Sequence, residues 1–136
     1  MHLRTTEKRL LRSRIKEFYR FCNMEHWTGC YQLLDSQLRE KGNFDIVSYT
    51  KNLAAFFKQY GPMRVVAILD VEIHPNAKRY EGRNFASGLV VWQDKKLYGY
   101  HLHMQRWVQS EEDGKWYTRL AGLVLYDPEQ SLTISE

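Results

Sequence analysis

The sequence contains only two cysteines and no long apolar run. Cys22 and Cys30 stand eight residues apart, a spacing that matches neither a zinc site nor a redox motif. We interpret both as buried thiols of a cytoplasmic protein. No apolar run approaches the roughly 18 residues that a membrane-spanning helix needs. Because the first residues also lack the apolar core of a signal peptide, we expect no membrane partner.

Motifs of several enzyme classes are missing as well. The chain has no glycine-rich phosphate loop. Neither Ser36 nor Ser87 has a histidine or an acid at the spacing of a serine nucleophile. The net charge of +4 is mild, and the dense positive charge of the first twenty residues stops after Arg20. We interpret this charge as a solvated helix face, and we expect no nucleic-acid partner, cofactor or metal.

The residues that are present indicate one ordinary globular domain over residues 1–136. A chain of 136 residues can bury a hydrophobic core without disulfides or metal ions. Hydrophobic residues make up 43% and charged residues 26%, as in typical soluble domains. Aromatic residues reach 14%, which suggests either a lined pocket or a buried interface.

The first half of the chain predicts three amphipathic helices. The first begins after Thr5 or Thr6, the second covers about 24–39, and the third follows Asn43 or Asp45. The third ends near Gly61-Pro62, because proline disfavours helix in the residue before it. Apolar residues recur three and four positions apart in each helix: Leu11, Ile15, Phe18 and Cys22; Trp27, Tyr31, Leu34 and Leu38; and Ile46, Leu53, Phe56, Phe57 and Tyr60.

The second half predicts four strands, at about 64–74, 85–93, 97–109 and 116–126. A hairpin turn from Glu111 to Trp116 joins the last two. Helices followed by strands indicate an α+β fold, with the three N-terminal helices packed on one face of a curved, mostly antiparallel four-stranded sheet. We expect this arrangement to form a cone that could hold a pocket.

The third predicted strand has two faces that both look buried. We expect one face, which includes Tyr100, Met104 and Arg106, to line the cone beneath the helices. The opposite face has no helices left to cover it, and the economical cover is a second copy of the chain. We therefore predict a homodimer through the outer sheet face, with the interface residues His101, His103, Gln105 and Trp107.

The order of elements resembles the nuclear transport factor 2-like superfamily, whose cone-shaped, cystatin-like fold is shared with ketosteroid isomerases, scytalone dehydratase and polyketide-cyclase-like proteins. The residues that carry the resemblance are Trp27 and Leu34, the helix end from Phe56 to Pro62, and Arg106-Trp107-Val108 leading to Asp113-Gly114-Lys115-Trp116. The resemblance covers nearly the whole chain and implies the fold alone, because this fold hosts many unrelated functions.

Three functions remain open at this point. The first is a dimeric binding protein whose cone holds an apolar or aromatic ligand, with the ligand-binding residues Tyr19, Trp27, Tyr31, Tyr100, Met104 and Arg106. The second is an enzyme of the isomerase or dehydratase kind. The isomerases of the group use a carboxylate base, and the face with Tyr100, Met104 and Arg106 offers none. The third is an interaction module whose cone is plugged by Trp27, Phe56 and Phe57.

Two further groups of residues could form a functional site, but for each group we favour a structural explanation. His101 and His103 point the same way from one strand and could chelate a metal, with His74 or Glu72 as a third ligand. Asp70, Glu72 and His74 share a face and could work as an acid–base group. We favour a polar interface patch for the first group and solvated charges for the second. Arg106 is best explained by a structural salt bridge.

Overall fold

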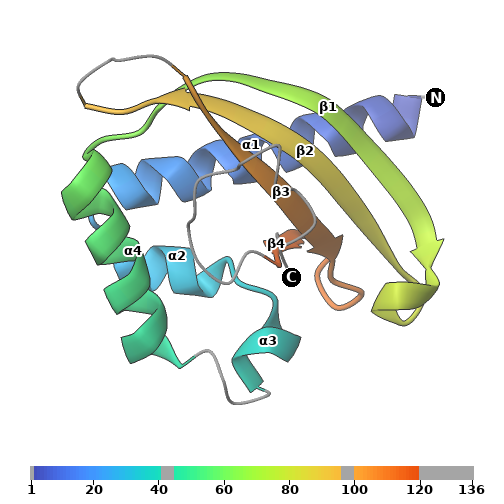
Figure 1. Cartoon of the computed structure of the whole chain (residues 1–136). Coiled ribbons are helices and arrows are strands. Elements are labelled where there is room, and N and C mark those ends of the chain that lie inside the picture. The colour runs from blue at the N-terminus through green and yellow to red at the C-terminus, as the bar shows by residue number, and fades with distance from the viewer. Residues whose placement is uncertain (1, 41–44, 96–99, 120–136) are drawn as a thin grey trace.

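The computed structural model describes residues 2–40, 45–95 and 100–119, and these form an α+β fold (Figure 1). The described helices are α1 (His2–Asn23), α2 (Trp27–Gln32), α3 (Ser36–Glu40) and α4 (Ile46–Tyr60). The strands β1 (Arg64–Ala77), β2 (Arg83–Gln93), β3 (His101–Gln109) and β4 (Trp116–Thr118) form an antiparallel sheet in sequence order. A short 3₁₀ turn, Lys78–Tyr80, connects β1 to β2.

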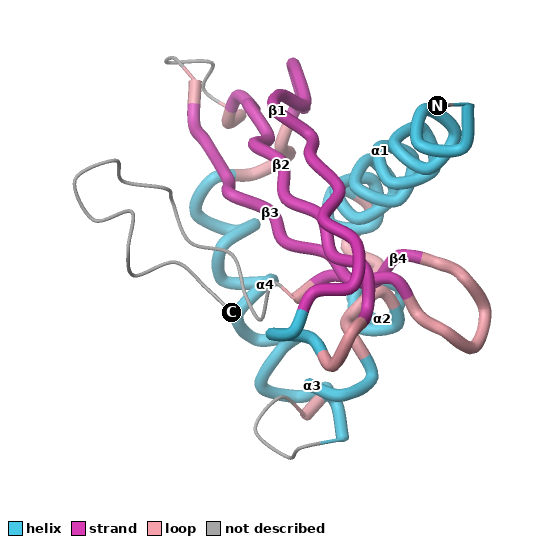
Figure 2. Tube along the Cα trace, turned by 90° about the vertical axis from the view of Figure 1, so that its right-hand side faces the viewer, coloured by secondary structure: helices cyan, strands magenta, loops and turns pink. Residues whose placement is uncertain are grey.

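The helices lie on one side of the sheet. α1 runs across the sheet behind β1 and β2, and α4 stands beside α2 at one end (Figures 1 and 2). The predicted stripe of α1 is confirmed, because Leu11, Ile15, Phe18 and Cys22 are all buried. The helix begins at His2, earlier than the predicted start at Thr5 or Thr6. No helix in the described part of the chain has the length and apolar character needed to cross a membrane.

The prediction of one helix over residues 24–39 is wrong, because the chain breaks into α2 and α3 around Leu34. The Asp35 amide donates to the Thr118 carbonyl at 2.9 Å, and the Thr118 amide donates to the Leu33 carbonyl at 2.7 Å. These bonds make a short parallel bridge between Leu34 and Thr118 at the end of β4. A distant strand thus takes the hydrogen bonds that would have continued the helix.

α4 begins and ends at the predicted residues. The Asp45 side chain accepts a hydrogen bond from the Ser48 amide at 2.9 Å, as a helix cap does. The helix stops at Gly61, whose φ of 71° is accessible to glycine at little cost. A Cβ atom at this position would lie 2.3 Å from Cδ of Lys95. The buried residues Tyr49, Leu53 and Phe56 form the face that α4 turns to the core.

The sheet bends because β1 is irregular. Its register with β2 shifts between Val65 and Ala67 and again between Leu69 and Glu72. Asp70, with a left-handed φ of 52°, lies inside the second irregularity. Bulges of this kind increase the local twist and bend of a strand. The predicted third and fourth strands begin and end at residues 97–99 and 120–126, which lie outside the described part of the chain.

Candidate functional site

A chain of buried polar side chains runs along the face of the sheet that the helices cover. Trp107 Nε1–H donates to Gln105 Oε1 at 3.1 Å, and Gln105 Nε2–H donates to Tyr19 Oη at 2.8 Å. Tyr19 Oη lies 2.7 Å from His103 Nδ1. Tyr19 comes from α1, whereas the other three side chains alternate along β3. None of the four is more than 2% exposed, so water does not reach this network from outside.

This network fixes the proton on His103. The Gln105 carbonyl already accepts from Trp107, so the Gln105 amide group is the end that donates to Tyr19. The proton of the Tyr19 hydroxyl then has Nδ1 of His103 as its acceptor. A neutral imidazole that accepts at Nδ1 carries its own proton at Nε2. His103 is therefore assigned the Nε2–H form from its hydrogen bonds.

Two N–H groups on this face have no partner among the described residues. Nε2 of His103 and Nε1 of Trp92 are both buried, and neither forms a hydrogen bond. The Tyr49 hydroxyl on α4 is a third such group. A buried polar group without a partner costs about 1–3 kcal/mol, and in native structures it often marks a water, an ion or a functional role.

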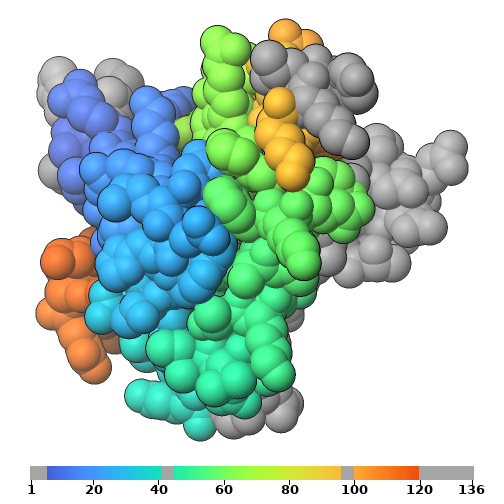
Figure 3. All heavy atoms as spheres, turned by 90° about the vertical axis from the view of Figure 1, so that its left-hand side faces the viewer, coloured from blue at the N-terminus to red at the C-terminus, as the bar shows by residue number. Residues whose placement is uncertain are grey.

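Aromatic rings surround these unpartnered groups. The His103 ring centroid lies 5.0 Å from that of Trp92 and 5.5 Å from that of Phe56. Tyr60 and His101 extend the cluster, with their centroids 6.1 and 4.6 Å from that of Trp92. His101 is also held at 2.9 Å by Asp94. Figure 3 shows the side of the molecule on which α1, α2 and α4 meet. Phe56 of α4 reaches the rings of Trp92 and His103 from this side.

The interior network carries no charge at neutral pH. Burial, reinforced by the nearby His101, lowers the pKa of His103 to about 3. Burial also raises the pKa of Tyr19 well above its usual value, and the nearby Cys22 adds to this effect. A general base works best when its pKa lies near the working pH, so His103 is a poor one. The network is better suited to binding and orienting a ligand than to transferring protons.

The predicted assignment of the two faces of β3 is wrong. His103, Gln105 and Trp107 were expected on the outer face as a dimer interface, yet they are buried beneath α1 within a single chain. His101 lies on the same inner face, at its rim, with 26% of its side chain exposed. Tyr19 supplies the hydrogen bonds that satisfy His103 and Gln105 on this buried face.

The predicted ligand-binding residues are scattered. Met104 and Arg106 alternate with the buried residues of β3 and are half-buried on the outer face, and Tyr100 is 64% exposed. Trp27 and Tyr31 lie on α2 and pack against α4, with ring centroids 5.9 Å from Phe57 and 5.7 Å from Tyr49. Of the predicted set, Tyr19 is the residue that joins the buried network.

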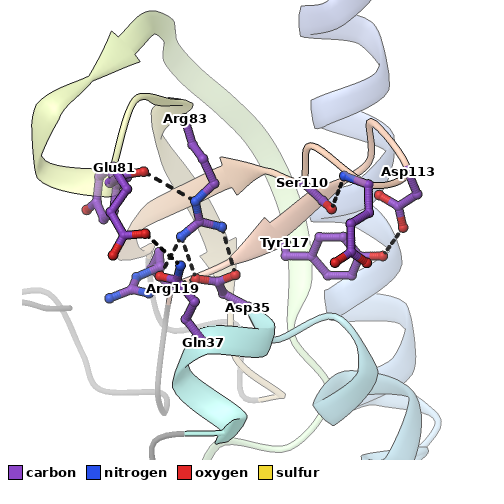
Figure 4. Close-up of polar contacts among 10 residues, drawn as sticks. Asp35, Gln37, Glu81, Arg83, Ser110, Asp113, Tyr117 and Arg119 are labelled. Atoms are coloured by element: carbon purple, nitrogen blue, oxygen red, sulfur yellow. Dashed lines mark hydrogen bonds and ion pairs between the residues drawn. The ribbon is translucent and has the colours of Figure 1, made fainter.

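A second polar group closes the far end of the sheet (Figure 4). The carboxylate of Asp35, 3% exposed, accepts hydrogen bonds from Arg83 at 3.0 and 3.1 Å and from Arg119 at 2.7 Å. Burial alone would raise the pKa of Asp35, but the two guanidinium groups outweigh it and hold that pKa below its usual value. Gln37 also accepts from Arg83 at 2.9 Å.

A groove of about 310 Å³ lies over this ion-pair group. It is lined by Asp35, Ser36, Gln37, Arg39, Glu81, Arg83, Ser110, Glu111, Glu112, Asp113 and Tyr117. The buried charges of Asp35 and Arg83 already satisfy each other, so we interpret the group as a structural lock. Sequence reasoning did not single out Asp35. The pair Asp35-Ser36 is a helix-start signal that could have revealed both the helix break and this residue.

The described residues do not have the geometry that the metal hypothesis or the acid–base hypothesis requires. Within the described residues, no group of three or more histidine, cysteine or acidic side chains is arranged to hold a metal ion. Nδ1 of His103 is bonded to Tyr19, and Nε2 of His101 to Asp94. Glu72 and His74 form an exposed pair at 3.7 Å on β1, as solvated charges do.

Comparison with known proteins identifies no relative of this chain. No family model matches it, and neither a curated protein nor a solved structure is detectably similar.

Proposed function

We propose that this protein binds a small apolar or aromatic molecule between the sheet and its helices, beside His103 and Trp92. The observation that carries the proposal is the pair of buried N–H groups, Nε2 of His103 and Nε1 of Trp92, that have no partner among the described residues. Ligand sites in proteins are mostly apolar and aromatic, with a few polar groups that fix orientation. The rings of Phe56, Tyr60 and His101 supply that apolar frame.

The buried network supports binding over an isomerase or dehydratase reaction. Such a reaction needs a group that exchanges protons near neutral pH, and the low pKa of His103 keeps it neutral there. The hydrogen-bonded partners of His103 and Gln105 are Tyr19 and Trp107, and neither supplies a carboxylate. The third possible function is an interaction module with a plugged interior, and a failure to bind any ligand in the test below would favour it.

The superfamily and the cellular compartment of the protein are also proposals. A nuclear transport factor 2-like domain is supported by the order of elements, in which helices precede an antiparallel sheet whose last described strands are joined through Asp113-Gly114. The two free, buried thiols Cys22 and Cys30 support a reducing compartment such as the cytoplasm.

We further propose that the homodimer forms through the outer face of the sheet, with different residues from those first expected. The strand register puts an apolar group at the centre of that face: Leu69, Leu89, Val91, Leu102 and Met104. Leu89 pairs with both Leu69 and Met104, so Leu89→Lys should turn a dimer into monomers in sedimentation equilibrium. Leu10→Lys, at a residue of α1 that is 49% exposed, is the matched control. A wild-type monomer would refute the dimer.

Binding is tested first on the protein as it is purified. Native mass spectrometry of the folded chain should show a mass increment of a few hundred daltons that disappears on denaturation. The same preparation of Trp92→Phe keeps an aromatic ring but loses the N–H group, and it should retain less of the bound molecule. A Tyr100→Phe control, altered at an exposed residue, should retain as much as the wild type. An unliganded wild type that also binds no member of an aromatic fragment library would refute the proposal.

A further inference from the structure

We infer that the interior ligand is a neutral aromatic molecule with a carbonyl oxygen, and that this oxygen accepts a hydrogen bond from Nε2–H of His103. Nε1–H of Trp92 is the second donor. The inference rests on the proposed function and adds the chemical class of the ligand. It follows from the polarity of the two unpartnered atoms on the strands, since both are donors. The unpartnered Tyr49 hydroxyl lies on α4 and can donate as well as accept.

Nε2 of His103 is a donor because of three residues, two on β3 and one on α1. Trp107 orients Gln105, Gln105 donates to Tyr19, and Tyr19 donates to Nδ1 of His103. Each hydrogen bond fixes which atom donates in the next one, so the proton of the neutral His103 ring lies at Nε2. The indole nitrogen of Trp92 is a donor in every state. A ligand that offered only donors would leave both groups unsatisfied.

The two donors belong to neighbouring positions on one surface. Trp92 and His103 lie on the adjacent strands β2 and β3, both on the inner face, with ring centroids 5.0 Å apart and planes inclined by 33°. Phe56 of α4 approaches both rings, at 5.5 and 5.8 Å between centroids. The three rings pack on one another at such distances, so the surface that they offer is aromatic. The surroundings therefore favour a flat, aromatic body for the ligand.

Among the described residues around His103 there is no lysine or arginine, which favours a neutral oxygen over a carboxylate. The groups packed around His103 are Tyr19 from α1, Phe56 from α4, Trp92 from β2 and His101 from its own strand. His101 is the nearest titratable base, and it already pairs with the carboxylate of Asp94. A buried carboxylate would need a charge partner that these residues do not provide. A carbonyl oxygen needs only the donors that are there.

The experiment uses the full chain labelled with ¹⁵N and three probes of similar size: acetophenone, ethylbenzene and benzoate. Chemical-shift titration should show that acetophenone binds about tenfold more tightly than ethylbenzene, because only the ketone satisfies the buried donors. Benzoate should bind least tightly. In Trp92→Phe, which lacks the indole N–H, the ratio between the affinities for acetophenone and ethylbenzene should shrink.

The ¹⁵N shifts of the His103 ring in the free protein give a reading that needs no ligand. They should report a proton at Nε2 and a hydrogen-bonded, unprotonated Nδ1. A proton at Nδ1, or equal affinities for acetophenone and ethylbenzene, would overturn the carbonyl inference and leave binding itself standing. Failure of all three probes to bind would count against the inference and the proposed function together.

Discussion

The hydroxyl oxygen of Tyr19 lies 2.7 Å from Nδ1 of His103, although 84 positions separate the two residues in the chain. The contact joins α1 to the inner face of the sheet. Because the Gln105 amide donates to the same hydroxyl, one tyrosine fixes the orientation of two side chains on β3. This single residue satisfies both buried side chains, and its hydrogen bond to Nδ1 places the proton of His103 at Nε2.

The first prediction concerns Tyr19 itself. Tyr19→Phe should reduce the free energy of unfolding by about 1–3 kcal/mol, because the buried Gln105 amide and His103 Nδ1 both lose their partner. Urea unfolding followed by circular dichroism measures the change. Tyr100→Phe removes a hydroxyl from a residue that is 64% exposed, and it should change stability by less than about 0.5 kcal/mol. Equal effects of the two substitutions would contradict the role of Tyr19.

The second prediction is a dependence of stability on pH. The pKa of His103 is about 3 in the folded protein, below the usual value of about 6.5, so between these values the unfolded chain binds a proton that the folded chain does not. Stability should therefore fall as the pH drops below about 6.5, by up to about 1.4 kcal/mol per pH unit from this group.

His103→Gln provides the comparison for that pH dependence, since glutamine does not titrate. Urea unfolding of both proteins at several pH values from 7 to 4.5 should give a steeper fall for the wild type. At the acid end of the range, the two slopes of unfolding free energy against pH should differ by nearly the amount that one bound proton produces. Parallel slopes would mean that His103 is protonated at its usual pKa in the folded state.

The third prediction concerns the ion-pair group at Asp35. Asp35→Asn removes the negative charge between two guanidinium groups, whose side chains are only 11% and 16% exposed. Breaking a buried ion pair in this way costs about 3–5 kcal/mol, because the partner charges stay buried. Asp45→Asn is the control: it also removes one carboxylate, but asparagine caps a helix about as well as aspartate. Thermal unfolding should separate the two variants by several degrees.

The sequence correctly predicted the stripe of α1, and Leu53 and Phe56 in that of α4, but it missed Tyr49 and wrongly included Ile46, which is 40% exposed. Its single helix over residues 24–39 is wrong for a definite physical reason. The stripes of α1 and α4 depend on local spacing and helix caps, so Leu11 and Leu53 could be placed in the core from their neighbours alone. The break at Leu34 depends on Thr118, which lies 84 positions further along the chain. Helix propensity carries no information about such a distant competitor.

The faces of β3 show a second limit of sequence reasoning. Alternation correctly sorted its residues into two sets, one with His103 and Gln105 and the other with Leu102 and Met104. The more apolar set was expected inside, yet the polar set is buried. A buried histidine and glutamine are stable only when their hydrogen bonds are satisfied, and Tyr19 satisfies them from another element. Such a partner cannot be recognised from the strand alone.

The last prediction concerns the two thiols, whose sulfur atoms lie 3.6 Å apart in the core. The hydrogen bond with Cys30, together with burial, raises the pKa of Cys22 well above its usual value. Because both sulfurs are buried, the two cysteines should react with Ellman's reagent at least about a hundredfold more slowly in the folded protein than in urea. Cys22→Ala leaves a single thiol and should give half the colour yield after unfolding. A rapid reaction of either thiol in the native protein would show that the core between α1 and α2 opens easily, because neither sulfur is exposed in the closed fold.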